Sequence, residues 1–326
     1  MNKRNFILRA GAAAAIACAM GTGSIASAQS WPNKPVRIVV PFAAGGPADI
    51  VAREVAQKLT NQLGQSFVVE NAGGGHGIPA MNTVSRGPAD GHVLLMAASG
   101  NVTIQPITMK ASADALATLE PVGQVATSPH VLVVTSKLPV KSVKELVDYA
   151  KANPGKVNFG SAGTGGLAHL GMELFKYQGK VDVVHVPYKG TSQVMVDISS
   201  GQVQALFSSM PSLKPLVDKG SIRVIGLTAP SDGADTAGVP LISATVPGVE
   251  YTTWYAFFAP KGTPAAVANR LNEEMKKVAA DPVLRKKLSD QGVDLQASSA
   301  AELQALMKRD TDKWAKLIKE AKIEIE

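Results

Sequence analysis

Residues 36–53 read V-R-I-V-V-P-F-A-A-G-G-P-A-D-I-V-A-R, an apolar β-branched run that enters a glycine turn and leaves it as a helix. Gly45 and Gly46 let the backbone approach a ligand closely, and Pro47 suits the first position of a helix. A turn of this kind points backbone N–H groups at an anion. The segment Phe42–Asp49 is therefore a candidate anion site.

Two further glycine-rich segments follow extended runs, Asn71–Gly77 and Ser161–Gly166. Their backbone amides, with the hydroxyls of Ser161 and Thr164, form a set rich in hydrogen-bond donors. Carboxylate or phosphate oxygens are the natural partners of such donors. Each segment alone could equally be a tight connection between a strand and a helix.

Asp49 has two interpretations. With Gly46 as N-cap and Pro47 next, it lies at the third helical position, where an acid complements the helix dipole. The alternative is that it accepts hydrogen bonds from a ligand or orients the loop that contacts one.

Two glycine patterns, Gly75-x-Gly77-x-x-Ala80 and Gly163-x-Gly165-x-x-Ala168, satisfy a relaxed dinucleotide fingerprint. Pro79 interrupts the first. Neither is followed by an acid that closes the next strand and could hold a ribose. We expect no cofactor.

Nucleophilic catalysis lacks its usual context, because Phe159 stands where a Gly-x-Ser-x-Gly elbow before Ser161 needs its first glycine. A triad of Ser161, His169 and Asp182 is conceivable. However, His169 lies two turns into an expected helix, where capping or packing is the commoner role. We expect no enzyme, with a secreted hydrolase using Ser161 as the alternative.

The histidines give no support for a metal site, since none of them pair at metal-binding spacing or beside an acidic cluster. They are His76, His92, His130, His169 and His185. His76, inside a glycine segment, could contact a ligand. His185 is more typical of a satisfied strand-end histidine. Just beyond it, Tyr188 and Lys189 are candidates for a cleft, although lysine is usually solvated.

Residues 1–28 are typical of a cleaved secretory signal, with three early cations, a short apolar run and the small-residue site Ala26-Ser27-Ala28. We expect a periplasmic protein cleaved after Ala28. Lipidation at Cys18 is the alternative. If cleavage follows Ala28, no cysteine remains for disulfides or thiolate chemistry.

The formal charge of +7 includes the three cations of the signal and no acid there, which leaves +4 on the mature chain. The Lys and Arg residues are scattered, and no aromatic stacking platform accompanies them. We expect no nucleic-acid partner. A weak positive field would favour an anionic small molecule.

Apolar runs alternate with helical segments, which predicts an α/β fold with a largely parallel sheet. The expected strands are Val36–Val40, Phe67–Val69, Val93–Met96, Val131–Val134, Val181–Val186, Val203–Phe207 and Ile222–Leu227. Helix starts are expected at the capping boxes of Ser142 and Ser299, and at Thr263 and Asp281, each of which precedes a proline.

After Tyr251–Ala259 the chain reads as almost entirely helical. Those helices need an earlier sheet to pack on, so we expect a discontinuous first domain, 29–125 and 253–326. A second domain then spans 126–252. Roughly 300 mature residues exceed the size at which single cores usually stop growing.

The whole chain resembles the substrate-binding receptors of tripartite tricarboxylate transporters, the TctC or Bug type. Each motif is weak, but their order and spacing are specific. The motifs are V-V-P-F-A-A-G-G-P-A-D (39–49) with Ala52-Arg53, V-E-N (69–71), P-A-D-G-H-V-L-L (88–95), G-S-A-G-T-G (160–165), His169, E-L-F (173–175), His185–Gly190 and A-P-K-G-T-P (259–264).

The resemblance implies a type II-like periplasmic binding protein, with two α/β domains that close on an organic carboxylate at a hinge. It also implies delivery to the permease subunits of the transporter, with a ligand-sensing receptor as an alternative, and we expect a monomer. The resemblance implies binding by the first loop and the Ser161 loop, and the candidate ligand-binding residues are in all Phe42, Ala43, Ala44, Gly45, Gly46, Asp49, His76, Ser99, Ser161, Ala162, Gly163, Thr164, Tyr188, Lys189 and Ser208.

The chain departs from the family pattern at Ser208-Ser209-Met210, where many members have Asp-Asn. A carboxylate that could pair with a ligand amine is thus missing, which disfavours an amino acid. His92 replaces a common tyrosine and is expected to bring an imidazole near the cleft. Together these features favour a dicarboxylate or aromatic carboxylate.

Overall fold

The computed structural model describes residues 31–188, 191–231 and 233–325. The chain divides into two units, Met1–Asn33 and Lys34–Glu326. The described part of the first unit, residues 31–33, contains no helix or strand. The expected signal, 1–28, and Lys189 lie outside the described residues.

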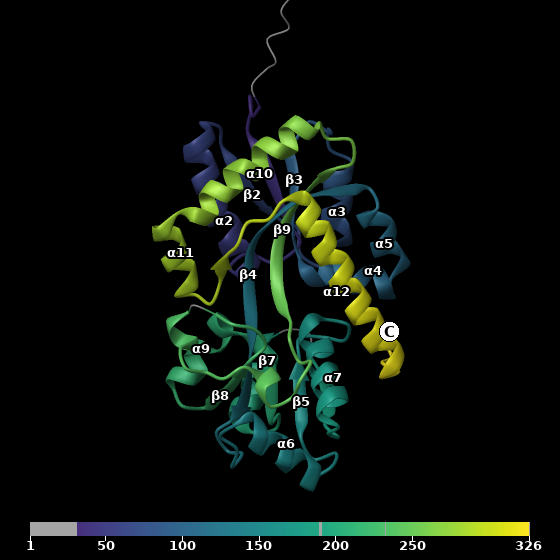
Figure 1. The fold of residues 1–326 in the computed structure, drawn as a ribbon, viewed down its shortest axis with the longest axis vertical. Helices are drawn as coiled ribbons and strands as arrows, with labels where there is room; N and C mark the ends of the chain where they lie inside the picture. Colours follow the sequence, from purple (N-terminus) through teal and green to yellow (C-terminus); the bar gives the residue numbers. More distant parts are fainter. Residues whose placement is uncertain (1–30, 189–190, 232, 326) are drawn as a thin grey trace, which may run out of the picture. The chain divides into compact units, whose positions relative to one another are not determined.

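The second unit holds a mixed ten-stranded sheet that falls into two halves (Figure 1). One half has the order β2-β1-β3-β9-β4, with β10 also on β4. The other has the order β4-β7-β5-β6, with β8 also on β4. The strands are β1 (Val36–Val40), β2 (Phe67–Asn71), β3 (Val93–Ala98), β4 (Leu119–Thr135), β5 (Asn158–Ser161), β6 (Val184–Pro187), β7 (Ala205–Ser209), β8 (Ile222–Leu227), β9 (Thr252–Pro260) and β10 (Asp294–Leu295).

Helices flank both halves of the sheet, as Figure 1 shows. They are α2 (Pro47–Leu63), α3 (Ile78–Ser85), α4 (Gln105–Thr108), α5 (Lys110–Leu116), α6 (Val143–Ala152), α7 (Leu167–Gly179), α8 (Thr191–Ser200), α9 (Met210–Asp218), α10 (Ala265–Ala280), α11 (Pro282–Ser289) and α12 (Ala300–Glu320). Short turns of helix are η1 (Gly75–Gly77), η2 (Gly100–Ile104), η3 (Ala234–Thr236) and η4 (Ile242–Ala244).

The α/β class is confirmed, but the expectation of a largely parallel sheet is wrong. Strand β1 pairs in parallel with β2 and β3, and β5 with β6 and β7. Every pairing of β4 and β9 is antiparallel. The expected strand Val131–Val134 covers only the last part of β4, and β9 was not among the expected strands. Local sequence patterns do not encode strand direction, so the antiparallel pairing of these two strands was not predicted.

Strand β4 takes part in both halves of the sheet. Its first part pairs with β9, and its second part with β7 and β8. The expected domain boundaries, near residues 125 and 252, fall inside β4 and at the start of β9. They stay a prediction.

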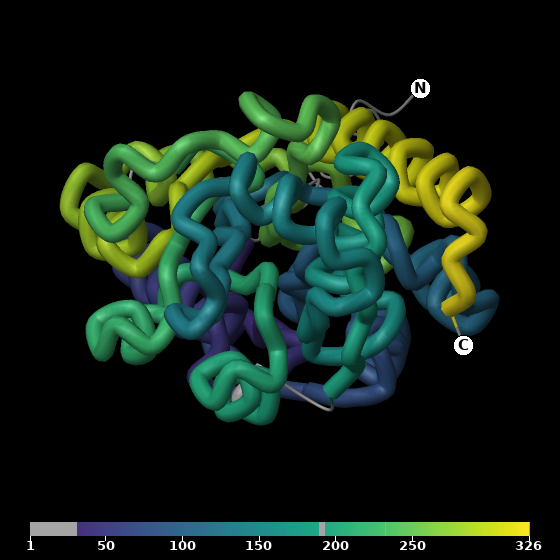
Figure 2. The backbone as a smooth tube through the Cα atoms, turned by 90° about the horizontal axis from the view of Figure 1, so that it is seen from below, coloured from purple at the N-terminus to yellow at the C-terminus, as the bar shows by residue number. Residues whose placement is uncertain are grey.

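Buried apolar clusters pack against both halves of the sheet. One lies under the first half of the sheet around Met81, Leu95 and Phe258, and two lie against the second half, around Phe159 and around Val194. Helix α12, yellow in Figures 1 and 2, contributes to two of them. Its Leu303 belongs to the first cluster and its Trp314 to the second.

Most expected helix starts are confirmed. Ser299 and Glu302 form a full capping box, and the side chains of Ser142 and Asp281 each accept a backbone N–H of the following turn. The expectation for Thr263 is wrong. Its hydroxyl donates to the Pro260 carbonyl instead, and Pro264 is the N-cap of α10.

Candidate functional site

A cavity of about 800 Å³ lies at the carboxyl ends of β1, β3 and β7 and beside the loop that follows β5. Ligands of α/β proteins bind characteristically at such strand ends. Its lining residues are Phe42, Ala43, Ala44, Gly45, Gly46, Pro47, Ala48, Ala98, Ser99, Gly100, Asn101, Gln105, His130, Ala162, Gly163, Gly165, Gly166, Leu167, Ala168, Leu206, Phe207, Ser208, Ser209, Ser212, Thr253 and Tyr255.

None of those lining residues is an Asp, Glu, Lys or Arg. Polar recognition within the described part of this cavity therefore rests on backbone amides, hydroxyls, two side-chain amides and one imidazole. Three helices begin at its wall, α2, α7 and α9, with N-caps Gly46, Gly166 and Ser209. No side chain caps any of the three, so their terminal N–H groups are available to an anion.

Asp49 holds the first loop from behind. It occupies the expected third position of α2, is buried, and does not line the cavity. Its carboxylate accepts bonds from the Gly45 N–H, from Arg53 Nε and from Asn71 Nδ2, each at 2.9 Å. Burial would raise the pKa of Asp49, but these three donors outweigh it and lower that pKa. Asp49 thus fixes the loop as an anion in the structure.

The second glycine segment, Asn71–Gly77, supports the first loop. Asn71 also donates to the Phe42 carbonyl at 3.1 Å. A Cβ on Gly73 would lie 3.0 Å from the Ala43 nitrogen, so a larger residue would press on the backbone of the first loop. His76 is exposed, has a φ of 56° and does not line the cavity, although its carbonyl accepts a bond from Asn101.

Ser161 lies beneath the third glycine segment and is only 1% exposed. Its Oγ donates to the Gly163 carbonyl at 3.1 Å, and the Gly163 N–H lies 3.3 Å from the same oxygen. The Nε2 of His185 lies 2.6 Å from it. Ala162 and Gly163 line the cavity, whereas Ser161 and the exposed Thr164 do not. Ser161 therefore shapes the loop from inside.

Two stacked imidazoles complete this support. The rings of His169 and His185 lie 4.1 Å apart, centroid to centroid, at 22°. His169 Nδ1 accepts the Gly165 N–H at 3.1 Å, so the capping role expected for His169 is confirmed. Burial, and then the charge of Lys176, lowers the pKa of His185 to about 4. Burial also lowers the pKa of His169 to about 4, and its neighbours His185 and Lys176 add to the effect.

The conceivable triad of Ser161, His169 and Asp182 is not assembled, and that interpretation is wrong. The imidazole on Ser161 belongs to His185, and Asp182 is an exposed residue before β6. Among the described residues, no group of three or more His, Cys, Asp and Glu side chains could hold a metal ion.

The remaining candidates divide between the cavity and its surroundings. Ser99 and Ser208 line the cavity. Tyr188 does not, and its hydroxyl donates to Asp197 at 2.6 Å. Burial, together with this acceptor, raises the pKa of Tyr188 to about 12.

The expectation that His92 brings an imidazole near the cleft is wrong. His92 precedes β3, at the end of the strand away from the glycine loops, where its Nδ1 lies 3.1 Å from Asp90. The cavity imidazole is His130, which sequence reasoning missed, along with Asn101 and Thr253. Residues 129–131 read only as the approach to an apolar run, so no local pattern marked His130.

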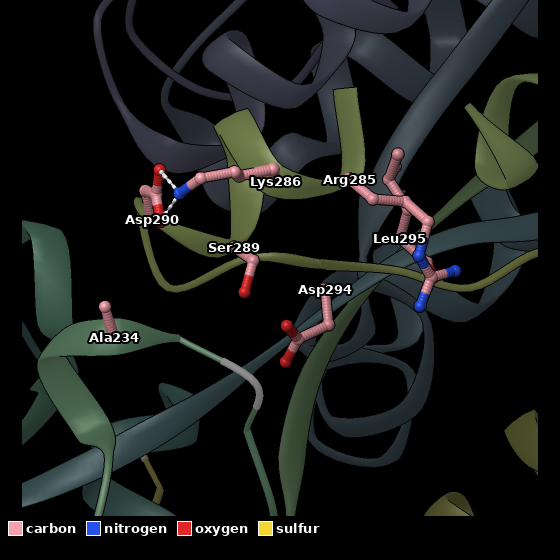
Figure 3. Close-up of a pocket in the computed structure, with 7 residues that line it drawn as sticks. All are labelled: Ala234, Arg285, Lys286, Ser289, Asp290, Asp294 and Leu295. Atoms are coloured by element: carbon pink, nitrogen blue, oxygen red, sulfur yellow. Dashed lines mark hydrogen bonds and ion pairs between the residues drawn. The ribbon is translucent and has the colours of Figure 1, made fainter. Parts of the chain in front are cut away.

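A smaller cavity of about 340 Å³ lies between α11, β10 and η3 (Figure 3). Its cations are already engaged. Lys286 pairs with Asp290 at 2.8 Å, and Arg285 donates to the carbonyls of Ala279 and Leu295. The larger cavity is thus the better candidate for binding an anion.

Within the described residues, no helix has the length and apolar character needed to cross a bilayer.

Residues 51–323 match the model of the family described as "Tripartite tricarboxylate transporter family receptor". A protein from the tcbD-tcbE intergenic region of Pseudomonas sp. strain P51 is 34% identical, over 95% of this chain and 94% of its own. An R. palustris protein solved with adipate is 32% identical with a TM-score of 0.80, over 90% of this chain and 99% of its own. The periplasmic binding protein BugD is 30% identical with a TM-score of 0.76, over 90% of this chain and 99% of its own.

Proposed function

The chain belongs to the tripartite tricarboxylate transporter receptor family, and from this premise we propose that it captures a small organic carboxylate in the 800 Å³ cavity. It then hands the ligand to the permease subunits of such a transporter. Export by the N-terminal segment places this capture in the periplasm. The similarity to a protein solved with adipate, a dicarboxylate, supports this ligand class.

The observation that carries the proposal is the pairing of two glycine-capped helix starts on one cavity. Helices α2 and α7 begin at glycine N-caps without side-chain caps, beside a space whose described lining has no acid to repel an anion. Hydrogen bonds to a charged group contribute roughly 1.5–3 kcal/mol each. Four of them, after ordering costs, give about −8 kcal/mol, which corresponds to micromolar affinity.

Capture without chemical conversion fits the position of Ser161. Its hydroxyl is buried, donates to the Gly163 carbonyl and stands outside the cavity lining. The 2.6 Å contact with His185 is the one observation that favours the hydrolase alternative. However, the described contacts of His185 include no carboxylate that would orient it as a base.

A thermal-shift screen of organic acids on residues 29–326 tests the proposal. We expect carboxylates to raise the unfolding temperature of the protein. Calorimetry should then show that these acids bind with a defined stoichiometry, and the acids should be recovered chemically unchanged. The neutral amides of the same acids are the control, and they should leave the unfolding temperature unchanged. If no carboxylate stabilises the protein, the proposal fails. Product formation that disappears in Ser161→Ala would instead support the hydrolase.

Delivery to a permease is tested separately. Deletion of this chain should abolish uptake of the captured acid while transcription of the transport genes persists. Uptake that survives the deletion would contradict delivery and favour a sensing receptor.

A further inference from the structure

We propose that residues 321–325, which follow α12, hold the third glycine segment, Ser161–Gly166, in the shape that binds the ligand, and that Ile325 is the positioning residue. The inference rests on the proposed function, because this segment is one of the two proposed to bind the carboxylate. Ile325 does not line the cavity. It acts through Gly165, which does.

Helix α12 brings these residues to the glycine segment. Its first part packs on the first half of the sheet through Leu303, and its later part packs on the second half through Trp314. Between the two, Asp310 accepts the Nε1–H of Trp254 at 2.8 Å, which ties the helix to β9. The yellow helix in Figure 1 accordingly runs from the first half towards α7. Its end is thus placed by contacts with both halves.

The chain turns back directly after α12. The Ile323 N–H donates to the Ile318 carbonyl at 3.0 Å, the six-to-one bond of a Schellman helix end. Lys322, inside this turn, has a φ of 50°, in the left-handed region that is unfavourable for a lysine. The packing of the residues that follow must offset this cost.

The residues after the turn alternate between buried and exposed. Ile323 and Ile325 are half-buried, and Glu324 between them is exposed. Both isoleucines pack against the apolar cluster that Leu167 and Ala168 also join, and these last two residues begin α7 and line the cavity. Residues 321–325 and the start of α7 therefore share one apolar support.

The closest approach is between Ile325 and Gly165. A Cβ on Gly165 would lie 2.9 Å from Ile325 Cγ2, so this methyl group occupies the space of a side chain. The N–H of Gly165 is held separately, by His169 Nδ1 at 3.1 Å. Gly165 is thus fixed by a hydrogen bond and by an apolar contact. Gly166 and Leu167 follow directly, so a shift of Gly165 would displace the amides proposed to meet the acid.

Removal of the Ile325 contact should reduce the fraction of molecules whose loop has the binding shape, and the apparent Kd rises by the inverse of that fraction. We expect Ile325→Ser to weaken binding about fivefold, measured by calorimetry on residues 29–326. The probe is adipate, or the most stabilising carboxylate of the screen where adipate does not bind. Ile325→Val keeps the methyl group and should bind within about twofold of the wild type. Glu324→Ser, at the exposed neighbour, is the matched control and should keep the wild-type affinity.

Tyr149→Ala separates positioning from general packing. Tyr149 lies on α6, packs against the same cluster and does not line the cavity. Its loss should lower the unfolding temperature and leave the affinity unchanged. In ¹H–¹⁵N spectra, Ile325→Ser should shift the amides of Gly165 and Gly166 in the free protein. Saturation with the acid should return them to the positions of the bound wild type.

Gly165→Ala tests the contact from its other side. The added Cβ presses on Ile325, and the residue must keep a φ of 74°, so binding should weaken. If Ile325 acts through Gly165, Ile325→Ser should cost less than about twofold once Gly165→Ala is present.

Four results overturn the positioning role: wild-type affinity in Ile325→Ser, an equal loss in Glu324→Ser, an equal loss in Tyr149→Ala, or a full further loss in the double variant. Each leaves the proposed function intact, because the wild type still binds a carboxylate. Binding of no screened carboxylate by the wild type would overturn the proposed function and this inference with it.

Discussion

The loop before α2 and the loop before α7 present the same surface to the cavity but are held by opposite chemistry. Each follows a parallel strand and ends in a glycine N-cap without a side-chain cap. The first is fixed by the buried, ionised Asp49 with Arg53. The second is fixed by Ser161 and two imidazoles whose pKa values are lowered to about 4. Similar anion sites can thus stand on a charged support or on a neutral one.

The difference predicts unequal sensitivity to mutation. Asp49→Ala should have the largest effect, because it leaves the Gly45 N–H and Asn71 Nδ2 without their acceptor and Arg53 without its partner. We expect a loss of about 3 kcal/mol in the free energy of unfolding and at least tenfold weaker binding of the best acid. Urea denaturation and calorimetry measure the two.

The control for Asp49→Ala is Asp114→Ala, which breaks an exposed pair with Lys110 one turn away. Such a pair contributes little, so stability should change by less than about 1 kcal/mol. Equal losses in both variants would show that Asp49 has no special place under the loop.

Ser161→Ala should weaken binding about tenfold, since it removes the oxygen that joins His185 to Gly163. Its control is Ser142→Ala, which removes the cap of α6 and should cost about 1 kcal/mol of stability with no change in affinity. If Ser161→Ala binds as the wild type does, the second loop does not depend on its buried support.

The stability that the His169–His185 pair contributes and the stability that Asp49 contributes should depend on pH in different ranges. In the unfolded chain both histidines titrate near 6.5, whereas in the fold they stay neutral to about pH 4. The unfolded state therefore binds more protons in this window, and stability from the pair falls as the pH drops from about 6.5 to 4. Asp49, with a lowered pKa, loses its contribution only below the ordinary Asp range.

His169→Gln/His185→Gln should flatten this pH dependence by about 2 kcal/mol. Urea denaturation at pH 7 and pH 5 measures it. A wild-type slope that persists in the double variant would assign the effect to other groups, such as His130.

The smallest effect is expected in the segment Asn71–Gly77, which supports the first glycine loop and whose His76 does not line the cavity. His76→Ala removes an exposed imidazole outside the cavity, so affinity should stay within about twofold. A tenfold loss by calorimetry would return His76 to the site.

Sequence reasoning located the elements whose cause is local. Continuous β-branched runs marked β1 and β8 at their observed bounds, and the serine and aspartate caps marked α6, α11 and α12. Strand β5 escaped because Asn158–Ser161 contains one large apolar residue, and only its pairing with β6 and β7 makes it a strand.

The residues of the site likewise fall into those that local sequence patterns predict and those that only the pairing of strands brings together. The glycine loops were visible because their residue types are needed where they stand. His130 and Thr253 meet only because β4 and β9 pass through the centre of the sheet, while Ser161 meets His185 through the pairing of β5 with β6. Contacts that depend on strand order and direction leave no trace in local spacing.

The central claim is that one carboxylate is held by the amides of both glycine loops. The most direct measurement is a ¹H–¹⁵N correlation spectrum of residues 29–326, recorded while the best acid of the screen is added. The amides of Gly46, Ala48, Gly166 and Leu167, which line the cavity, should shift together and saturate at the calorimetric stoichiometry. Shifts confined to one loop, or centred on Arg285 and Lys286 at the smaller cavity, would contradict it.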